Sequence, residues 1–504
     1  MANPTKILEL KGTDWMKGLS IQSGLALGGL FDYAYNFDPF DTMGYLRGSL
    51  APVTLDASTI TTQVKHFTSV AYSADGYVFA LGDRADTGTK CFYKIKLLDN
   101  TVEDYSGNID TGHGGAIKHS GMTYHDSKVV YCSANNTIRS VSTTGTSDVE
   151  ILTSAASGGF DFPVAFGMGA DGELYYTNNT ASSIGKIVLV TGTAGNVSNA
   201  FTIADTSFRP KDITSDGIYT IIVADNNLYG STISTASCKV FFWDNISSRA
   251  TIIYDIPDSS IIAARYVNGK VVVIGASGLW VCNSATPPKL IFPLATSKLP
   301  TGANQVVTKD GILYWTSPTY VYAYGSKVGK DILFTPFRST DNDNLHSALG
   351  TSGPYFLTGL DTGTNTPKVI LLNSGSTRTI SQLQSVTTSL PQPYTFSYAK
   401  VVLKESLGTG DKVTLSVFNG EGNVVMAATD KSYAVNGAKK TLIFNPILSI
   451  GSGVTEFIDL KAYLEINQGE TGDVIVQRVS VYGIPQEDYS QKIWQKNTQM
   501  KWKK

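Results

Sequence analysis

The sequence predicts an all-β protein, namely a seven-bladed β-propeller followed by an antiparallel β-sandwich. Three observations predict it: a turn motif recurs roughly every 46 residues, strands with alternating polarity follow it, and the composition favours short strands. The chain has 504 residues, of which 42% are hydrophobic, 16% are charged and 48 are glycine. A chain of this length and hydrophobicity can bury a large core and divide into domains.

The recurring motif is a tight turn, usually Asp-Gly or Asn-Gly, directly before a short apolar strand. Both residue types tolerate positive φ and therefore close tight hairpins. The turns begin at residues 75, 126, 171, 216, 268, 310 and, in a degenerate copy, 352. Further apolar stretches lie on both sides of the turns, and three or four short strands per repeat are what a propeller blade requires. We therefore expect a propeller over 53–375, with six blades as the alternative because the last copy is imperfect.

From residue 376 to 485 the repeat gives way to longer alternating strands. The predicted strands are 398–404, 412–418, 423–427, 440–444, 457–466 and 473–482. In one of them Lys461, Tyr463 and Glu465 alternate with Ala462, Leu464 and Ile466. Such alternation gives each strand one buried and one solvated face. We interpret this region as an antiparallel β-sandwich.

The two ends differ from the rest of the chain. Residues 1–52 are rich in glycine and aromatic side chains, and we expect a strap that closes the propeller or packs across its face, or an arm on a neighbouring subunit. Residues 486–504 form a basic tail with two tryptophans. This tail is either a frayed terminus or a contact for a partner, since tryptophan is enriched at interface hot spots.

Charge and composition exclude several classes of function. Lys plus Arg is 40 and Asp plus Glu is 42, and a net charge of −2 removes the usual electrostatic case for binding nucleic acid or anionic membranes. We expect no signal peptide and no membrane-spanning helix, because no basic start precedes an apolar core and no apolar run is long enough. The four cysteines are far apart, so we expect free thiols buried in strands: Cys91, Cys132, Cys238 and Cys282.

No motif for chemistry emerges. The sequence contains no nucleophile elbow, zinc-protease helix or phosphate-binding loop. His113, His119 and His125 are evenly spaced, but turn-like residues separate them, so we do not expect a metal site. Asp341–Asn344 lacks the later Gly and Glu of a calcium loop. We predict no catalytic residues, no metal and no cofactor.

One stretch carries a family resemblance. Gly44-Tyr45-Leu46-Arg47 followed by Pro52 comes before the propeller, and the strands 457–466 and 473–482 end the sandwich. This layout resembles the β-propeller virion proteins of tailed bacteriophages, particularly the tail-hub or nozzle type of short-tailed phages, in which the last two strands form a closing hairpin. The resemblance implies a structural protein located in the virion tail and made in the host cytoplasm. Its implied partners are tail or portal and adaptor proteins and further copies of itself in a ring, with transient passage of phage DNA.

Partner contacts are expected at the two ends of the chain. The candidate residues are Phe40, Tyr45, Arg47, Trp494, Lys496 and Trp502. An adhesin that binds glycans or a receptor through propeller loops and the sandwich is the alternative, with tryptophan and tyrosine on blade loops stacking on sugars. A propeller hydrolase or lyase is a third hypothesis.

Overall fold

A computed structural model describes most of the chain and divides it into two compact units. The described residues are 3–20, 30–55, 64–72, 76–84, 90–96, 101–104, 122–132, 138–142, 148–152, 165–178, 182–188, 195–227, 237–339, 343–344, 349–352, 355–362, 368–372, 374–437, 439–445, 456–469 and 472–486. Residues 50–376 form one unit, here called the propeller unit. Residues 1–49 together with 377–504 form the other, here called the terminal unit.

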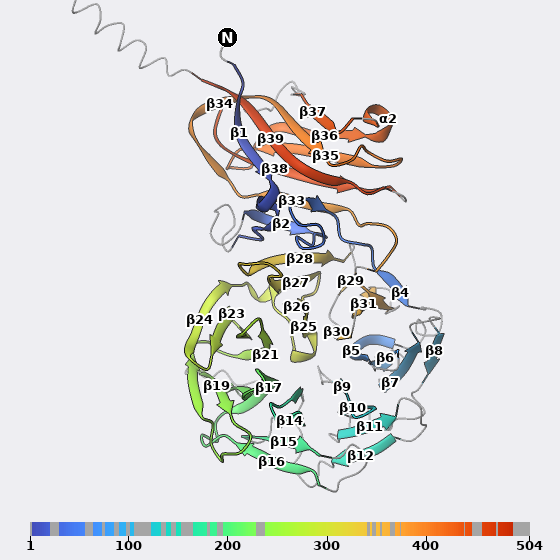
Figure 1. Ribbon diagram of the computed structural model, residues 1–504, viewed down its shortest axis with the longest axis vertical. Coiled ribbons are helices and arrows are strands. Elements are labelled where there is room, and N and C mark those ends of the chain that lie inside the picture. The colour runs from blue at the N-terminus through green and yellow to red at the C-terminus, as the bar shows by residue number, and fades with distance from the viewer. Residues whose placement is uncertain are drawn as a thin grey trace, which may run out of the picture. The chain divides into compact units, whose positions relative to one another are not determined.

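The propeller unit consists of small antiparallel sheets, each built from strands consecutive in the chain, arranged around a common centre as in a β-propeller (Figure 1). The first three sheets contain β5 (Val64–Tyr72), β6 (Tyr77–Arg84), β7 (Lys90–Lys96) and β8 (Thr101–Asp104); β9 (Met122–His125), β10 (Lys128–Cys132), β11 (Ile138–Ser142) and β12 (Asp148–Leu152); and β13 (Phe166–Met168), β14 (Leu174–Asn178), β15 (Ser183–Ile187) and β16 (Val197–Thr202).

The next three sheets follow the same pattern. They contain β17 (Arg209–Ser215), β18 (Thr220–Asp225), β19 (Cys238–Trp243) and β20 (Ile252–Ile256); β21 (Ile261–Val267), β22 (Lys270–Gly275), β23 (Gly278–Asn283) and β24 (Thr286–Pro293); and β25 (Val306–Lys309), β26 (Ile312–Thr316), β27 (Tyr320–Gly325) and β28 (Ile332–Arg338). Two 3₁₀ turns, η3 (Thr296–Lys298) and η4 (Ala303–Gln305), connect β24 to β25.

The last sheet closes the ring with a strand from the other end of the unit. It combines β29 (Asp343–Asn344), β30 (Leu349–Ser352), β31 (Tyr355–Thr362) and β32 (Lys368–Leu371) with β4 (Val53–Leu55). In this pairing Leu55 lies opposite Val369. The Leu55 side chain is fully buried in a cluster with Val70 and Val78 of the first sheet and Leu357 of the last. Strand pairing and apolar packing therefore join the two ends of the ring.

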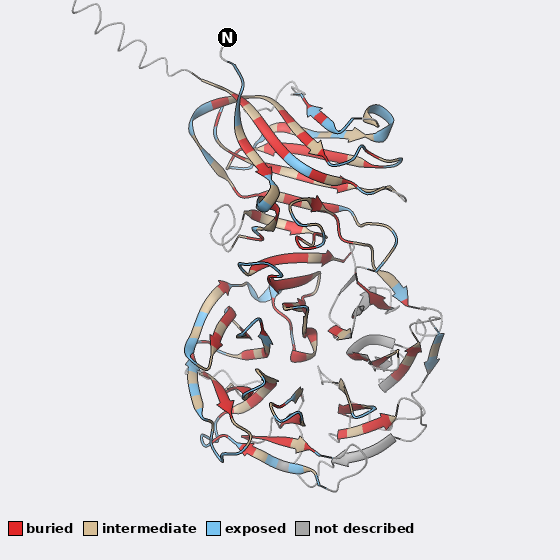
Figure 2. Ribbon diagram, viewed as in Figure 1, coloured by how far each residue is buried: buried red, intermediate tan, exposed pale blue. Residues whose placement is uncertain are grey.

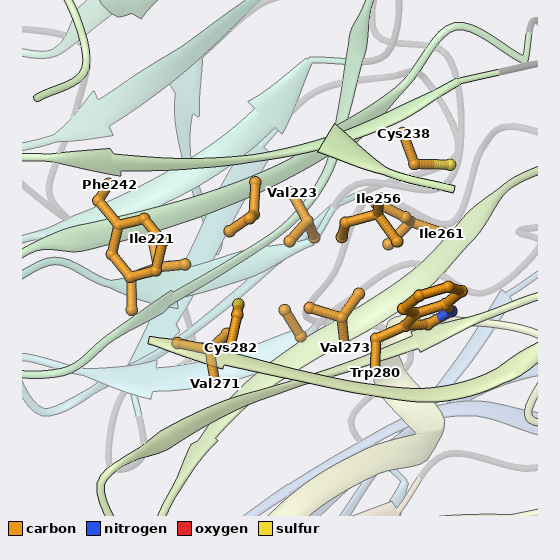
Figure 3. Packing of buried hydrophobic residues seen from close by; sticks show 12 residues of the cluster. Ile221, Val223, Cys238, Phe242, Ile256, Ile261, Val271, Val273, Trp280 and Cys282 are labelled. Carbon is orange, nitrogen blue, oxygen red and sulfur yellow. The ribbon is translucent and has the colours of Figure 1, made fainter. Parts of the chain in front are cut away.

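Neighbouring sheets pack face to face through apolar side chains. Between the sheets β17–β20 and β21–β24, a cluster of twelve buried residues includes Ile221, Phe242, Val273 and Trp280 (Figure 3). Burial decreases outward: every residue of β18 is buried, whereas β24, on the rim in Figure 2, has a single buried residue. The apolar strand after each turn is thus the second strand of its sheet, where both faces are covered.

The predicted turns connect the first and second strands of the sheets. At Asn268-Gly269 and Asp310-Gly311, both residues have positive φ, and the flanking residues pair directly as in a two-residue hairpin. Asp126-Ser127 has the same conformation without glycine. The turns at 171 and 216 differ: only Gly172 and Gly217 have positive φ, and longer loops connect their strands. The common sequence motif therefore produces two kinds of turn.

The terminal unit combines strands from both ends of the chain. One group pairs β1 (Thr5–Lys11), β39 (Ile475–Pro485), β34 (Thr388–Leu403) and β37 (Thr441–Phe444), with β3 (Leu46–Arg47) also on β39. The other pairs β2 (Phe31–Tyr35), β33 (Ser381–Ser385), β38 (Phe457–Asn467), β35 (Lys412–Phe418) and β36 (Val424–Ser432). A 3₁₀ turn, η1 (Gly12–Met16), follows β1, and a short helix, α2 (Tyr433–Asn436), follows β36.

The strands predicted after residue 376 form, and the alternation in β38 places Ala462, Leu464 and Ile466 in the core. The implied closing hairpin is wrong, because β38 and β39 do not pair with each other; β34 lies between them and pairs with both. Long β34 can do this because its first half pairs with β38 and its second half with β39. The pairing of β1, β2 and β3 with the C-terminal strands was not anticipated from the sequence.

Candidate functional site

The first strands of the sheets enclose a cavity at the centre of the propeller unit. Its volume is about 590 Å³. Strands β5, β9, β13, β17, β21, β25 and β30 all contribute to its wall, largely with backbone, apolar side chains and hydroxyl groups. Asp212 and Arg265 are the two charged residues of this lining, which contains no histidine, cysteine, lysine or glutamate. The charged groups of the lining are therefore confined to these two side chains.

Asp212 and Arg265 form an ion pair that spans three consecutive sheets. Asp212, on β17, is fully buried and accepts hydrogen bonds from the backbone N–H groups of Ile213 and Ala264, both at 2.9 Å. Arg265, on β21, donates from Nη1 to Asp212 and to the Ala264 carbonyl at 2.7 Å. It also donates to the carbonyls of Val306 at 3.0 Å and Ala303 at 2.9 Å. The pair thus links β17, β21 and the start of β25.

The chemistry of this pair follows from its burial. Removal from water raises the pKa of the Asp212 carboxyl, and Arg265 and the two backbone amides oppose that rise. Most of the hydrogen-bonding groups of both side chains are engaged by the protein itself. We conclude that the charged groups of the cavity hold the sheets in register, and that the cavity has room for ordered water.

The sequence contains a signal for this pair. Arg265 interrupts an otherwise apolar first strand, Ile261–Val267, and in the preceding repeat Asp212 stands in the first strand directly before Ile213. A charge in a strand that must be buried needs a partner, and two such charges in adjacent repeats can supply each other. The pairing itself required the three-dimensional arrangement, because Asp212 and Arg265 are separated by a full repeat.

Other buried acids have the same anchoring role in this region. Asp225, at the end of β18, accepts from the Ile261 N–H at 2.9 Å and lies 3.4 Å from Lys211 Nζ. Asp258 accepts from Trp280 Nε1 at 2.8 Å and from the Ser277 N–H at 3.0 Å. These carboxylates satisfy backbone donors that the strands leave unpaired.

Of the predicted contact residues, three lie in the described part of the terminal unit. Phe40 is 8% exposed and belongs to the core. Tyr45 is partly exposed, and Lys404 Nζ lies 5.2 Å from the centre of its ring. Trp494, Lys496 and Trp502 lie outside the described residues. A partner role for all of these residues stays a prediction.

Arg47, the remaining predicted contact residue, lies in a cluster of two arginines and two aspartates. Its Nε donates to Asp473 Oδ1 at 2.7 Å, and its Nη1 lies 3.6 Å from Asp41. Arg378 joins the same acids, at 2.9 Å from Asp41 and 3.3 Å from Asp473. The hydrogen bond to Asp473 raises the pKa of Arg47. The cluster fixes the segment around Tyr45 to the segment before β39.

The cysteines described with side chains match the prediction. Cys132, Cys238 and Cys282 are free and buried. Burial raises the pKa of the Cys282 thiol to about 12 and also raises the pKa of Cys238, so both stay protonated at neutral pH. Cys91 lies on β7, but its side chain is outside the described part.

The residues considered for metal binding are only partly described. His125 is on β9, whereas His113, His119, Asp341 and Asn342 lie outside the described residues. In the described ranges, no three histidine, cysteine, aspartate or glutamate side chains come together as they would around a metal ion. No helix in those ranges has the length and apolar character to cross a membrane.

The tryptophans do not form sugar-binding platforms on the described blade loops. Trp243, Trp280 and Trp315 are at most 6% exposed and pack within the propeller unit, and Trp15 is buried in the terminal unit. Tyr266, in the strand before one of the predicted turns, is 37% exposed. The idea that exposed tryptophans stack on sugars is therefore wrong for the three tryptophans of the propeller unit, which fill the spaces between and within the sheets. Stacking on tyrosines of the blade loops stays a prediction.

Comparisons with known proteins identify no family and find distant structural likenesses. No protein-family model matches the chain, and no curated protein matches it. Among solved structures, it is similar to the Dos1 propeller, with 11% identity and a TM-score of 0.41 over 65% of this chain and 96% of that one. It is also similar to virginiamycin B lyase from Staphylococcus aureus, with 13% identity and a TM-score of 0.44 over 64% of this chain and 98% of that one. A third similar structure is YCF48 bound to D1 peptide, with 10% identity and a TM-score of 0.43 over 64% of this chain and 95% of that one. Likeness at this level says nothing about the function of this chain.

Proposed function

We propose that this chain is a non-enzymatic structural component of a tailed-phage virion, forming a ring at the tail or at the head–tail junction in the manner of a tail hub or nozzle. The observation that carries the non-enzymatic part is the central cavity. Its charged pair, Asp212 and Arg265, is engaged by the backbone of neighbouring sheets. A propeller held together in this way supplies rigidity rather than reactive groups.

We further propose that the propeller has seven blades and that the terminal unit is an antiparallel sandwich. The sheet that contains β4 and β30–β32 supports the seventh blade, because it supplies its own first strand to the central cavity. Two strand groups with alternating buried residues, as in β38 and β39, support the sandwich. Both features suit a component of a particle, since a propeller closed on itself leaves few unpaired strand edges.

The virion role rests on the resemblance of Gly44–Arg47 and of the order of the domains. In the structure this motif is held by the contacts of Arg47 with Asp473 and Asp41, so it has a defined conformation. Several copies around the tail axis would contact one another and tail, portal or adaptor proteins, and phage DNA would pass through the ring. A closed ring needs a heterologous interface, in which two different surfaces of each copy meet.

Quantitative mass spectrometry on particles purified from the producing culture tests this proposal. We expect the chain at a fixed ratio to the major capsid protein, and a ring around the tail axis predicts about six or twelve copies per particle. Its absence from intact particles would overturn the proposal. If the chain is present, electron microscopy of the same particles would locate the ring of copies and count the blades of each propeller.

The glycan-binding alternative keeps one supporting observation, which lies in the terminal unit rather than on the blade loops. A pocket of about 680 Å³ has Tyr45 in its lining. Titration of the full chain with host-surface polysaccharide separates the hypotheses. Binding without release of products favours an adhesin, and release of oligosaccharides favours a hydrolase or lyase.

A further inference from the structure

The pocket in the terminal unit lies over an interruption in strand pairing. Strand β39 pairs with β1 up to the pair Lys11–Arg478, and with β3 from the pair Leu46–Val476. Gln477 falls between these two pairings and has no opposite residue on that edge. On the other edge, the pairing with β34 also skips Gln477. An irregularity of this kind redirects side chains out of the sheet and is common beside binding sites.

Two short segments form the walls of the pocket beside Gln477. On one side is η1, fixed by Trp15, whose ring is fully buried, stacks on Phe31 at 6.4 Å and donates from Nε1 to the Gln477 carbonyl at 3.4 Å. On the other side is the turn at Gly44 and Tyr45, which the Arg47 contacts fix in place. The volume of about 680 Å³ is within the roughly 300–1,000 Å³ typical of ligand pockets.

The charges around this pocket are unbalanced. Lys6, Lys11 and Arg478 share one carboxylate, that of Glu9, at 2.8, 2.5 and 3.8 Å respectively. The two lysines lower the pKa of Glu9 to about 2, so Glu9 is ionised across the physiological range and still leaves a positive surplus. Arg478 makes the longest of these contacts, beyond hydrogen-bond distance, and its side chain is 45% exposed. Its guanidinium is therefore available to an external anion.

The pocket also contains groups that suit a hydroxylated ligand. Asp14 accepts from the Lys11 N–H at 3.0 Å and pairs with Lys17 at 2.6 Å, and a carboxylate has lone pairs left for further donors. Thr13 and Gln477 add a hydroxyl and an amide to the lining. Tyr45 adds an aromatic ring, which Lys404 holds from one side.

We propose that this pocket binds a carboxylated sugar of an acidic saccharide. The Arg478 guanidinium binds the carboxylate through two parallel hydrogen bonds, and the Tyr45 ring packs against the sugar ring. Asp14 accepts from the sugar hydroxyls, which an acidic peptide side chain cannot offer. This inference goes beyond the structural role and does not depend on it.

Calorimetric titration of the full chain with trigalacturonate tests the proposal, with uncharged galactotriose as the matched probe. We expect trigalacturonate to bind and galactotriose to bind at least about tenfold more weakly, because it lacks the charge-assisted hydrogen bonds. Arg478→Gln should weaken trigalacturonate binding about tenfold. Tyr45→Ala should weaken it severalfold, and Tyr45→Phe should retain it because the ring remains. Arg249→Gln, at an exposed arginine of the propeller unit, is the control and should change nothing.

Several outcomes would overturn the proposal. They are equal affinity for the two saccharides, no trigalacturonate binding at millimolar concentration, or unchanged binding in both Arg478→Gln and Tyr45→Ala. A hexaglutamate peptide that binds with the same dependence on Arg478 and Tyr45 would assign the pocket to an acidic protein partner instead. Thermal melting checks the folding of each variant, and saturation-transfer NMR on the unmodified chain reports which sugar protons contact the protein even if a variant fails to fold. Mass spectrometry of particles tests the virion role separately, so the failure of either proposal can be recognised without the other.

Discussion

Arg265 in the propeller unit and Arg478 in the terminal unit show two uses of the same side chain. Arg265 is enclosed by a fully buried aspartate and by backbone carbonyls of two further segments, with four hydrogen bonds. Arg478 is at the end of the pairing between β39 and β1, half exposed, with one long contact to a glutamate that two lysines also share. Arg265 therefore stabilises the fold, whereas the guanidinium of Arg478 has N–H donors that can bind a further acceptor.

The difference arises from where each residue lies in its sheet. A first strand of the propeller is covered by its neighbours, so a charge there must be neutralised and hydrogen-bonded by the protein. The pairing of β39 with β1 ends at Arg478, next to the unpaired Gln477, and the exposed side chain of Arg478 keeps its water. In the sequence both are single arginines within strand-like segments, and position in the fold separates their roles.

The substitution Arg265→Met is expected to have the largest effect on stability and tests the role of the buried arginine. It leaves Asp212 buried without its cation, and removing one partner of a buried pair costs about 3–5 kcal/mol of unfolding free energy. Urea unfolding measures the loss, and amide exchange at Ala264, which donates to Asp212, should become faster. The double variant Asp212→Asn/Arg265→Met should be less destabilised than Arg265→Met, because no carboxylate is then stranded. Equal stability of Arg265→Met and the unmodified chain would contradict the anchoring role.

Closure of the ring provides the next largest effect. Leu55 comes from before the first repeat and is fully buried between the first and last sheets. Leu55→Ala should cost about 2–5 kcal/mol, the range for a leucine truncated in a core. Ile253→Ala, on the outer strand β20 at 51% exposure, is the matched control and should change stability by less than about 0.5 kcal/mol. If the two variants unfold alike in urea, β4 does not close the ring.

The repeat could be predicted because its signal is local. Turn residues such as Asn268-Gly269 and Asp310-Gly311 specify a backbone shape, and the apolar strand after them specifies burial. Ring closure by Leu55, the ion pair of Asp212 and Arg265, and the position of β34 between β38 and β39 are contacts between residues far apart in the chain. No spacing rule encodes them, because they depend on which surfaces meet after folding. Of the predicted contact residues, Phe40 shows the same limit: an aromatic side chain in a loop-rich segment turned out to be buried.

Gly311 and Gly217, each following the aspartate of a predicted turn, show how far a local signal determines the cost of a substitution. Gly311 has φ of +74°, and a Cβ there would lie 2.4 Å from Asn268 Oδ1, whose amide nitrogen donates to the Gly311 and Ser326 carbonyls. Gly217 has φ of +86° with open space around it. Gly217→Ala should cost about 1 kcal/mol from backbone strain alone, and Gly311→Ala about 2 kcal/mol because Asn268 must also move. Thermal unfolding of the two variants side by side measures the difference, and a larger loss at Gly217 would contradict it.

The smallest effect is expected at Arg478, which completes the comparison with Arg265. Arg478→Met removes a charge that is half exposed and 3.8 Å from its nearest acid, and Glu9 keeps Lys6 and Lys11. Such a surface contact contributes about 0–1 kcal/mol, so urea unfolding should place the variant within that range of the unmodified chain. A loss comparable to that of Arg265→Met would mean that Arg478 supports the sheet. Near-neutral stability, together with intact pairing of β1 and β3 to β39 in amide exchange, is what an arginine available to a ligand requires.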